Sequence, residues 1–188
     1  VAVDITTPEG QALIYEIAKT ADVVIENYKT GSLAKYGLDY ASLSELNPNI
    51  VYCSITGFGQ DGPRAEEPGY DFIIQGMSGL MSITGEPDDV TGGGAQKVGV
   101  AVVDIQTGLY STIAIQAALI ARSHTGRGQY IDMSLLDVQV AALANQGMNY
   151  LASGKAPQRM GNQHPSIVPY QTFKAKDKEF IIACGNDK

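Results

Sequence analysis

Residues 50–55 read IVYCSI, a run that is apolar except for Ser54 and about as long as one strand. The turn Asn47-Pro48-Asn49 precedes this run, and the glycine-rich loop 57–63 follows it. A strand with apolar residues on both faces is typical of a parallel sheet covered on both sides, because neither face of the strand meets water. Residues 40–46 have the spacing of a short helix. Helix, turn and buried strand in this order predict an α/β fold.

The same alternation continues on both sides of the strand. Thr7 precedes a proline at a first helical position, which predicts a helix over 8–20. A second run at 21–25, apolar except for Asp22, opens into the polar loop 26–31. Further elements are expected as a helix at 70–81, a strand at 130–134, and a helix at 102–121 that is apolar nearly all round and therefore deeply buried. Together they predict a Rossmann-like parallel sheet with flanking helices, whose functional loops follow the strand ends.

The C-terminal part of the chain predicts a different arrangement. Residues 84–99 follow neither a helical nor a strand pattern, and long irregular segments in compact domains are often functional. An Ala- and Leu-rich helix is expected at 135–152, and the runs 168–173 and 180–184 predict a hairpin.

These patterns predict two domains. We place the large domain at 1–155, and the linker and the start of a second, smaller α+β domain at 156–188. No Met precedes Val1, and the last strand stops almost as soon as it forms. We therefore expect the N-terminal part of the large domain and the rest of the small domain to be missing from this chain.

Composition narrows the classes of ligand and partner. The 188 residues are 44% apolar and 18% charged, with a net charge of −7. The basic residues are scattered, which argues against nucleic acid as a partner, so an anionic ligand needs a specific pocket. No apolar run is long enough for a membrane span. Cys53 and Cys184 resemble small core residues of a protein from a reducing cytoplasm more than a disulfide or a metal site.

The candidates for chemistry are carboxylates. The sequence has no phosphate-binding loop of the Walker type, no serine-hydrolase elbow and no His and Cys residues at metal-ligand spacing. Asp104 lies in the first turn of the predicted helix 102–121, after the irregular segment. A helix N-terminus stabilises an anion, and partial burial strips water from it. Helix capping is nevertheless the usual role of an Asp at this position, and spacing alone favours it.

Several short motifs along the chain bear on this choice. They are ADVVIENY at 21–28, Gly31 with Gly37, LNP at 46–48, SITGFG at 54–59, PGYD at 68–71, GLM at 79–81, Asp104 with Gly108, TGRGQ at 125–129 and GNQHP at 161–165. In this order and at these intervals, they closely resemble the class III, or CaiB/BaiF-type, CoA-transferases over essentially the whole chain. The resemblance implies that residues 1–155 bind CoA and that Asp104 is a catalytic nucleophile.

The resemblance also implies a covalent mechanism. Asp104 attacks an acyl-CoA thioester to give a mixed anhydride, and the CoA thiolate then attacks the aspartyl carbonyl to give an aspartyl-CoA thioester. An acceptor carboxylate reverses these steps and leaves as the new acyl-CoA. Coenzyme A is thus a substrate, and no prosthetic group or metal is implied. Family members form interlocked homodimers, so we expect these residues to expose apolar surface and aggregate on their own.

Further site residues follow from the same resemblance. It implies CoA contacts by Asn27, Tyr28, Lys29 and Lys35, and it places Tyr70 and Asp71 beside the thioester and the nucleophile. From the residues alone, a solvated helix lysine is the preferred interpretation of Lys35, and packing against the sheet is an alternative interpretation of Tyr28. Tyr70 and Asp71 read equally as a helix start with a capping Asp.

Two other functions stay open from the sequence. Acyl-CoA racemases of the same superfamily use a His at the position of Tyr70, and Tyr is a poor base at neutral pH. His124 and His164 read as structural. A non-catalytic CoA-binding module is the second alternative, and the retention of Asp104 argues against it. GNQHP at 161–165 replaces the glycine-run loop of oxalate-using relatives, so oxalate is disfavoured and a dicarboxylate donor such as succinate is a looser expectation.

Overall fold

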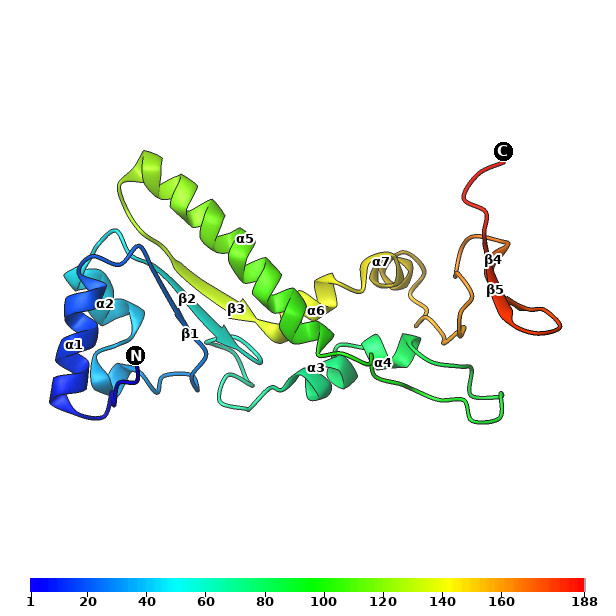
Figure 1. Ribbon diagram of the computed structural model, residues 1–188, viewed down its shortest axis with the longest axis horizontal. Coiled ribbons are helices and arrows are strands. Elements are labelled where there is room, and N and C mark those ends of the chain that lie inside the picture. The colour runs from blue at the N-terminus through cyan, green and yellow to red at the C-terminus, as the bar shows by residue number, and fades with distance from the viewer. Residues whose placement is uncertain (188) are drawn as a thin grey trace. The chain divides into compact units, whose positions relative to one another are not determined.

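The computed structural model describes residues 1–187, and their elements are shown in Figure 1. They form two compact units. The first combines residues 1–74 with 101–139, and the second combines residues 75–100 with those from 140 onward. These units reflect contacts within this chain, whereas the predicted boundary near residue 155 concerns the domains of a complete protein and stays a prediction. No helix among residues 1–187 is long and apolar enough to cross a membrane.

The first unit is built on a parallel three-stranded sheet, as the sequence predicted. Its strands are β1 (Val23–Glu26), β2 (Val51–Thr56) and β3 (Tyr130–Ser134), with β2 in the centre. The side chains of residues 51–54 are all buried. The apolar run therefore forms the central strand because only that place covers it on both faces.

Two helices and a short 3-10 turn cover one side of this sheet. They are α1 (Pro8–Ala18), α2 (Tyr40–Leu46) and η1 (Ala34–Tyr36). Their buried cluster includes Leu43 and Tyr52, and the Tyr52 hydroxyl donates to the Leu38 carbonyl at 2.8 Å. Thr7 caps α1 as predicted, since its Oγ1 accepts from the Gly10 amide at 3.1 Å.

The long helix α5 (Val102–Thr125) packs along β2 and β3. Its buried residues are Val103, Thr107, Ser111 and Ala118, which recur at helical spacing along one face. The prediction of deep burial all round was wrong. The apolar residues Ile105, Leu109, Ile113 and Ile120 are exposed among the described residues, because the sheet covers a single face of the helix.

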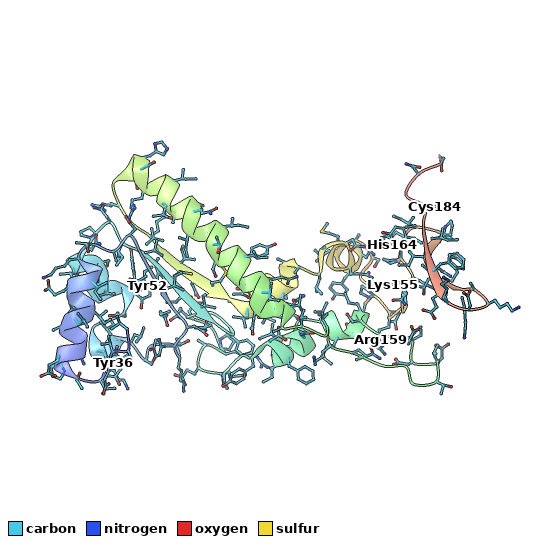
Figure 2. All side chains as sticks on the ribbon, in the orientation of Figure 1. Tyr36, Tyr52, Lys155, Arg159, His164 and Cys184 are labelled. Atoms are coloured by element: carbon cyan, nitrogen blue, oxygen red, sulfur yellow. The ribbon has the colours of Figure 1, made fainter. Side chains whose placement is uncertain are left out.

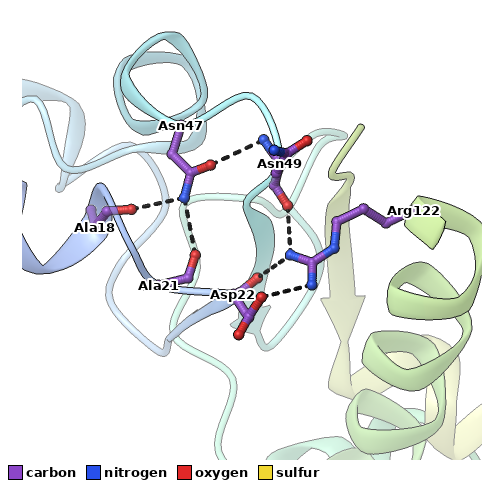
Figure 3. Close-up of polar contacts among 6 residues, drawn as sticks. All are labelled: Ala18, Ala21, Asp22, Asn47, Asn49 and Arg122. Atoms are coloured by element: carbon purple, nitrogen blue, oxygen red, sulfur yellow. Dashed lines mark hydrogen bonds and ion pairs between the residues drawn. The ribbon is translucent and has the colours of Figure 1, made fainter. Parts of the chain in front are cut away.

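The end of α5 distant from the first turn is anchored by Arg122 (Figure 3). Its guanidinium donates to the Asn49 carbonyl at 2.9 Å and to the Asp22 carboxylate at 2.7 Å. In the same region the Asn47 amide donates to the carbonyls of Ala18 and Ala21, at 2.9 and 3.0 Å. The turn 47–49 is thereby tied both to the end of α1 and to the end of α5.

Two predicted helices are each divided in two. The helix expected at 70–81 is α3 (Asp71–Met77) and α4 (Leu80–Ile83), and Gly79 between them has a φ of 91°. The helix expected at 135–152 is α6 (Leu135–Ala141) and α7 (Ala144–Ser153), and Ala144 has a φ of 49°. A residue in the left-handed region ends a right-handed helix even where the apolar spacing continues.

The second unit contains the irregular segment and a hairpin, both as predicted. Arg159, labelled in Figure 2, donates to the Ser82 carbonyl at 3.1 Å and pairs with Asp88, which ties the irregular segment to the linker. The hairpin is the antiparallel pair β4 (Tyr170–Lys174) and β5 (Glu179–Ala183). Cys184 follows β5 and is exposed, so its prediction as a core residue was wrong, while Cys53 is buried as expected.

Candidate active site

A cavity of about 740 Å³ opens in the first unit, where β1 and β2 end. The loop after β1, the end of β2, the segment 65–71 and the first turns of α5 line it. Ligands of open α/β sheets bind outside the carboxyl ends of the strands, which is the location of this cavity. It brings together all the predicted site residues except Lys35, namely Asn27, Tyr28, Lys29, Tyr70, Asp71 and Asp104.

Asp104 faces this cavity from the first turn of α5 and is exposed to solvent. Partial burial, and then the negative charge of Asp71, raise the pKa of Asp104 above its ordinary value. We expected the helix N-terminus to favour the ionised form, so the net effect of the surroundings is the reverse of that expectation. Gly108, one turn further along, also lines the cavity, and an added Cβ there would meet nothing within 4 Å.

Asp71 reaches the start of α5 from α3. Its Oδ1 accepts from the Val103 amide at 2.8 Å and lies 3.4 Å from the Asp104 amide. Ala101, the residue before the helix, provides no side-chain cap of its own. Asp71 therefore acts as a helix cap, but for α5 and not for the helix that it begins.

The position of Tyr70 and Asp71 depends on two glycines. The backbones of Gly57 and Gly69 cross so closely that a Cβ added to Gly57 would lie 2.4 Å from the Cα of Gly69. The sequence suggested that Gly57 allows close approach to a ligand, whereas here it allows close approach of another backbone segment. Gly59 has a φ of 87°, which explains its glycine by the turn alone. Tyr70 lines the cavity and is 71% exposed.

The loop after β1 is fixed to its neighbours by polar contacts. The side-chain amide of Asn27 donates to the Ile55 carbonyl at 2.6 Å, and the backbone amide of Tyr28 donates to the Glu26 carboxylate at 2.7 Å. Thr30 donates to the Ala65 carbonyl at 2.8 Å and so joins this loop to the segment that leads to Tyr70. Tyr28 lines the cavity, and 53% of its surface is exposed.

Lys35 lies apart from the cavity. It belongs to η1, and its Nζ lies 4.7 Å from the centre of the Tyr36 ring. Its placement is that of a surface lysine, and its predicted contact with CoA stays a prediction.

Several lining residues were not singled out from the sequence. Thr107 lies three residues after Asp104 and next to Gly108, which the motifs already included, so helical spacing could have identified it. Glu66 and Glu67 carry no sequence signal, and they make the lining rich in carboxylates, with Lys29 as its basic residue. Within residues 1–187, no group of three or more His, Cys, Asp or Glu side chains is arranged to hold a metal ion.

Comparison with known proteins identifies the family. The family model described as CoA-transferase family III matches residues 1–188. The chain belongs to this family. It is 61% identical to the succinate–glutarate CoA-transferase of Agrobacterium fabrum, covering 100% of this chain and 46% of that protein. It is 46% identical to the succinyl-CoA:glutarate CoA-transferase of Homo sapiens, covering 100% of this chain and 42% of that protein.

Solved structures agree with the predicted fold class. A CaiB/BaiF family protein from Brucella suis matches with a TM-score of 0.89 and 61% identity, over 100% of this chain and 48% of that one. The parallel sheet with flanking helices and the small antiparallel sheet are thus those of the CoA-transferase III family. The chain spans about half the length of the relatives that it matches.

Proposed function

We propose that this chain is the part of a class III CoA-transferase that carries its nucleophile, and that the complete enzyme moves CoA from an acyl-CoA to a carboxylic acid. The observation that carries the proposal is the position of Asp104. It faces an open cavity at the strand ends, with clear space beside it at Gly108. The names of relatives at 46–61% identity support CoA transfer as the reaction.

In the proposed mechanism, an Asp104 carboxylate oxygen attacks the thioester carbonyl. The C–S bond breaks, CoA leaves as a thiolate, and a mixed anhydride remains. The thiolate then attacks the aspartyl carbonyl and releases the donor acid as its carboxylate, which leaves an aspartyl-CoA thioester. The acceptor carboxylate attacks this thioester, and the thiolate attacks the acceptor's carbonyl in the new anhydride. The new acyl-CoA departs, and the Asp104 carboxylate is restored. The thioesters and anhydrides of this cycle are of comparable reactivity, so the exchange is divided into steps of similar height.

The neighbouring residues have proposed roles in binding. Asn27, Tyr28 and Lys29 contact CoA from the loop after β1, with Lys29 answering phosphate charge. Lys35 meets the outer part of CoA from η1. Tyr70 lies beside the thioester with its exposed hydroxyl, and Asp71 lies between the thioester and α5.

The relatives suggest the substrates and the assembly. We propose short dicarboxylates as the acids, with succinyl-CoA as a donor and a glutarate-like acceptor, from the names of the relatives in Agrobacterium fabrum and Homo sapiens. We also propose a homodimer in the cytoplasm. The exposed apolar face of α5 at Ile105, Leu109, Ile113 and Ile120 is consistent with a covering partner.

Racemisation is the second candidate, and the geometry gives it less support. A racemase needs a base on each side of the α-carbon, and no histidine is among the described residues that line the cavity. His124 lies in the last turn of α5. His164 is held by its own turn, because its Nδ1 accepts from the Ser166 amide at 3.0 Å and its ring packs on Tyr170.

Mass spectrometry of the complete protein tests the proposal. The protein is incubated with succinyl-CoA without an acceptor, digested, and searched for an acyl or CoA adduct on Asp104. We expect an adduct that disappears when glutarate is added. Proton exchange at the α-carbon without an adduct would support the racemase instead. Binding of succinyl-CoA without either outcome would support a non-catalytic module.

A further inference from the structure

The N-terminus of α5, where Asp104 lies, is capped by a second carboxylate. The first N–H groups of a helix have no partner within the helix and attract anions. In α5 the Val103 amide donates to Oδ1 of Asp71 at 2.8 Å, and the Asp104 amide lies 3.4 Å from the same oxygen. Val103 is fully buried, so the capped amide is out of reach of water and substrate.

We propose that Asp71 is a positioning residue for Asp104: its carboxylate caps α5 from another segment, fixes the backbone of the nucleophile and places a second negative charge beside it. This inference rests on the function proposed above. Asp71 touches the backbone of Asp104 and has no reacting atom of its own. It acts on the reaction through the location and charge state of its neighbour.

Asp71 contacts the backbone at the start of α5 from a distant part of the sequence. The cap comes from a residue 32 positions away, and Ala101 offers no side-chain alternative. Asp71 is itself placed by the Gly57–Gly69 crossing, where the two backbones meet. The end of β2, the start of α3 and the start of α5 are therefore linked in one chain of contacts that ends at the nucleophile.

The second charge changes the energy of the reaction. The titratable groups around the cavity are Tyr28, Lys29, Glu66, Glu67, Tyr70 and Asp71. Of these, Asp71 is the charge that raises the pKa of Asp104, in addition to burial. Two like charges repel while both carboxylates are ionised, and acylation of Asp104 removes one of them. Asp71 therefore favours the covalent intermediates over the free carboxylate pair.

The same contact excludes one source of catalysis. Because Asp71 accepts from the amides of Val103 and Asp104, these two amides do not supply hydrogen bonds for the oxyanion of the tetrahedral intermediate. The oxyanion donors must come from other groups around the cavity or from parts of the complete protein outside this chain.

The test compares two substitutions in the complete protein. Asp71→Asn keeps an acceptor for the Val103 amide and removes the charge, whereas Asp71→Ala removes both. With succinyl-CoA and glutarate, we expect kcat to fall on the order of tenfold for Asp71→Asn. We expect a fall on the order of a hundredfold for Asp71→Ala, since it also frees the backbone of the nucleophile. Thr7→Ala, which removes the cap of α1, is the matched control and leaves kcat unchanged.

A readout that is independent of activity separates this inference from the proposed function. Carbon NMR of aspartate-labelled protein without substrate follows the titration of the Asp104 carboxyl, assigned by its loss in Asp104→Asn. We expect Asp71→Asn to lower the pKa of Asp104 and move the acid limb of kcat/KM to lower pH. An unchanged titration and pH profile would overturn the role of Asp71. Activity that survives in Asp104→Asn would instead overturn the proposed function.

Discussion

The two ends of α5 are both held by side chains from distant parts of the sequence, but their electrostatics are opposite. At the C-terminal end, the Arg122 cation meets the Asp22 carboxylate and the Asn49 carbonyl, and a cation there also suits the helix dipole. At the N-terminal end, two carboxylates, Asp71 and Asp104, lie together. The first arrangement stabilises the fold, whereas in the second the charge of Asp71 raises the pKa of Asp104, so that ionisation of Asp104 costs stability.

Asp104→Asn removes the reactive carboxylate and has the largest expected effect. Transferase activity of the complete protein falls at least about 10⁴-fold, because the covalent route is lost. The amide keeps the shape of the side chain, so circular dichroism stays that of the parent. Residual activity within about tenfold of the parent would mean that another group attacks the thioester.

The same variant carries a prediction for stability against pH. The pKa of Asp104 is raised in the folded state, so the folded state binds the proton more tightly than the unfolded state. Ionisation of Asp104 therefore costs stability, which is lost as pH rises from its ordinary value through its raised value. Asp104→Asn is more stable than the parent above that window and equal to it below. Urea midpoints at both ends of the window measure the difference.

Gly57→Ala breaks the support of the N-terminal end. The added Cβ meets the backbone of Gly69, so the segment that carries Asp71 must move. We expect a loss of about 2 kcal/mol in the free energy of unfolding and, from misplacement of the site, on the order of a hundredfold in kcat. Gly99→Ala is the control, since an added Cβ there meets nothing within 4 Å. Equal activity of the two variants would contradict the role of the crossing.

Arg122→Ala breaks the C-terminal end alone. The Arg122 side chain is 22% exposed and the Asp22 side chain 75% exposed, so the bond to the Asn49 carbonyl matters more than the ion pair. Urea unfolding is expected to show a loss of about 2 kcal/mol for Arg122→Ala and about 0.5 kcal/mol or less for Asp22→Asn. The pH dependence of kcat/KM stays unchanged in both. A shifted acid limb would show that the two ends are coupled.

Gly108→Ala has the smallest expected effect on activity of these substitutions. Alanine stabilises a helix interior by up to about 1 kcal/mol over glycine, so the variant unfolds at higher urea. Its methyl group enters the open space beside Asp104, and KM for the acyl-CoA rises by about a few-fold. An unchanged KM would show that the acyl group passes elsewhere.

Local signals in the sequence predicted the parts of the fold that depend on near neighbours. The apolar run of β2, the Thr7 cap and the strand 130–134 each need only a few adjacent residues to be recognised. Breaks in the helices were missed because apolar spacing continues across Gly79 and Ala144, although the backbone there is left-handed. The exposed face of α5 was missed because composition cannot say which side a sheet covers.

The candidate site likewise has parts that the sequence predicted and parts that it did not. Motif order placed Asn27, Tyr28, Lys29, Tyr70, Asp71 and Asp104 in one group, and the cavity contains all of them. Lys35 lies outside the cavity. Its position in the sequence could not predict this, because it does not give the direction of the side chain. The cap of α5 by Asp71 could not be predicted from local patterns, because the two partners are 32 residues apart in the sequence.

In the proposed mechanism, the Asp104 carboxylate exchanges its oxygen atoms with the substrates. The complete protein turns over succinyl-CoA with glutarate whose carboxylates carry a heavy oxygen isotope, and is then digested with trypsin. Cleavage after Lys97 and Arg122 gives a peptide in which Asp104 is the only acidic side chain. The proposed mechanism leaves heavy oxygen in this side chain, and only when succinyl-CoA is present. Transfer of CoA to glutarate with no heavy oxygen at Asp104 would contradict it.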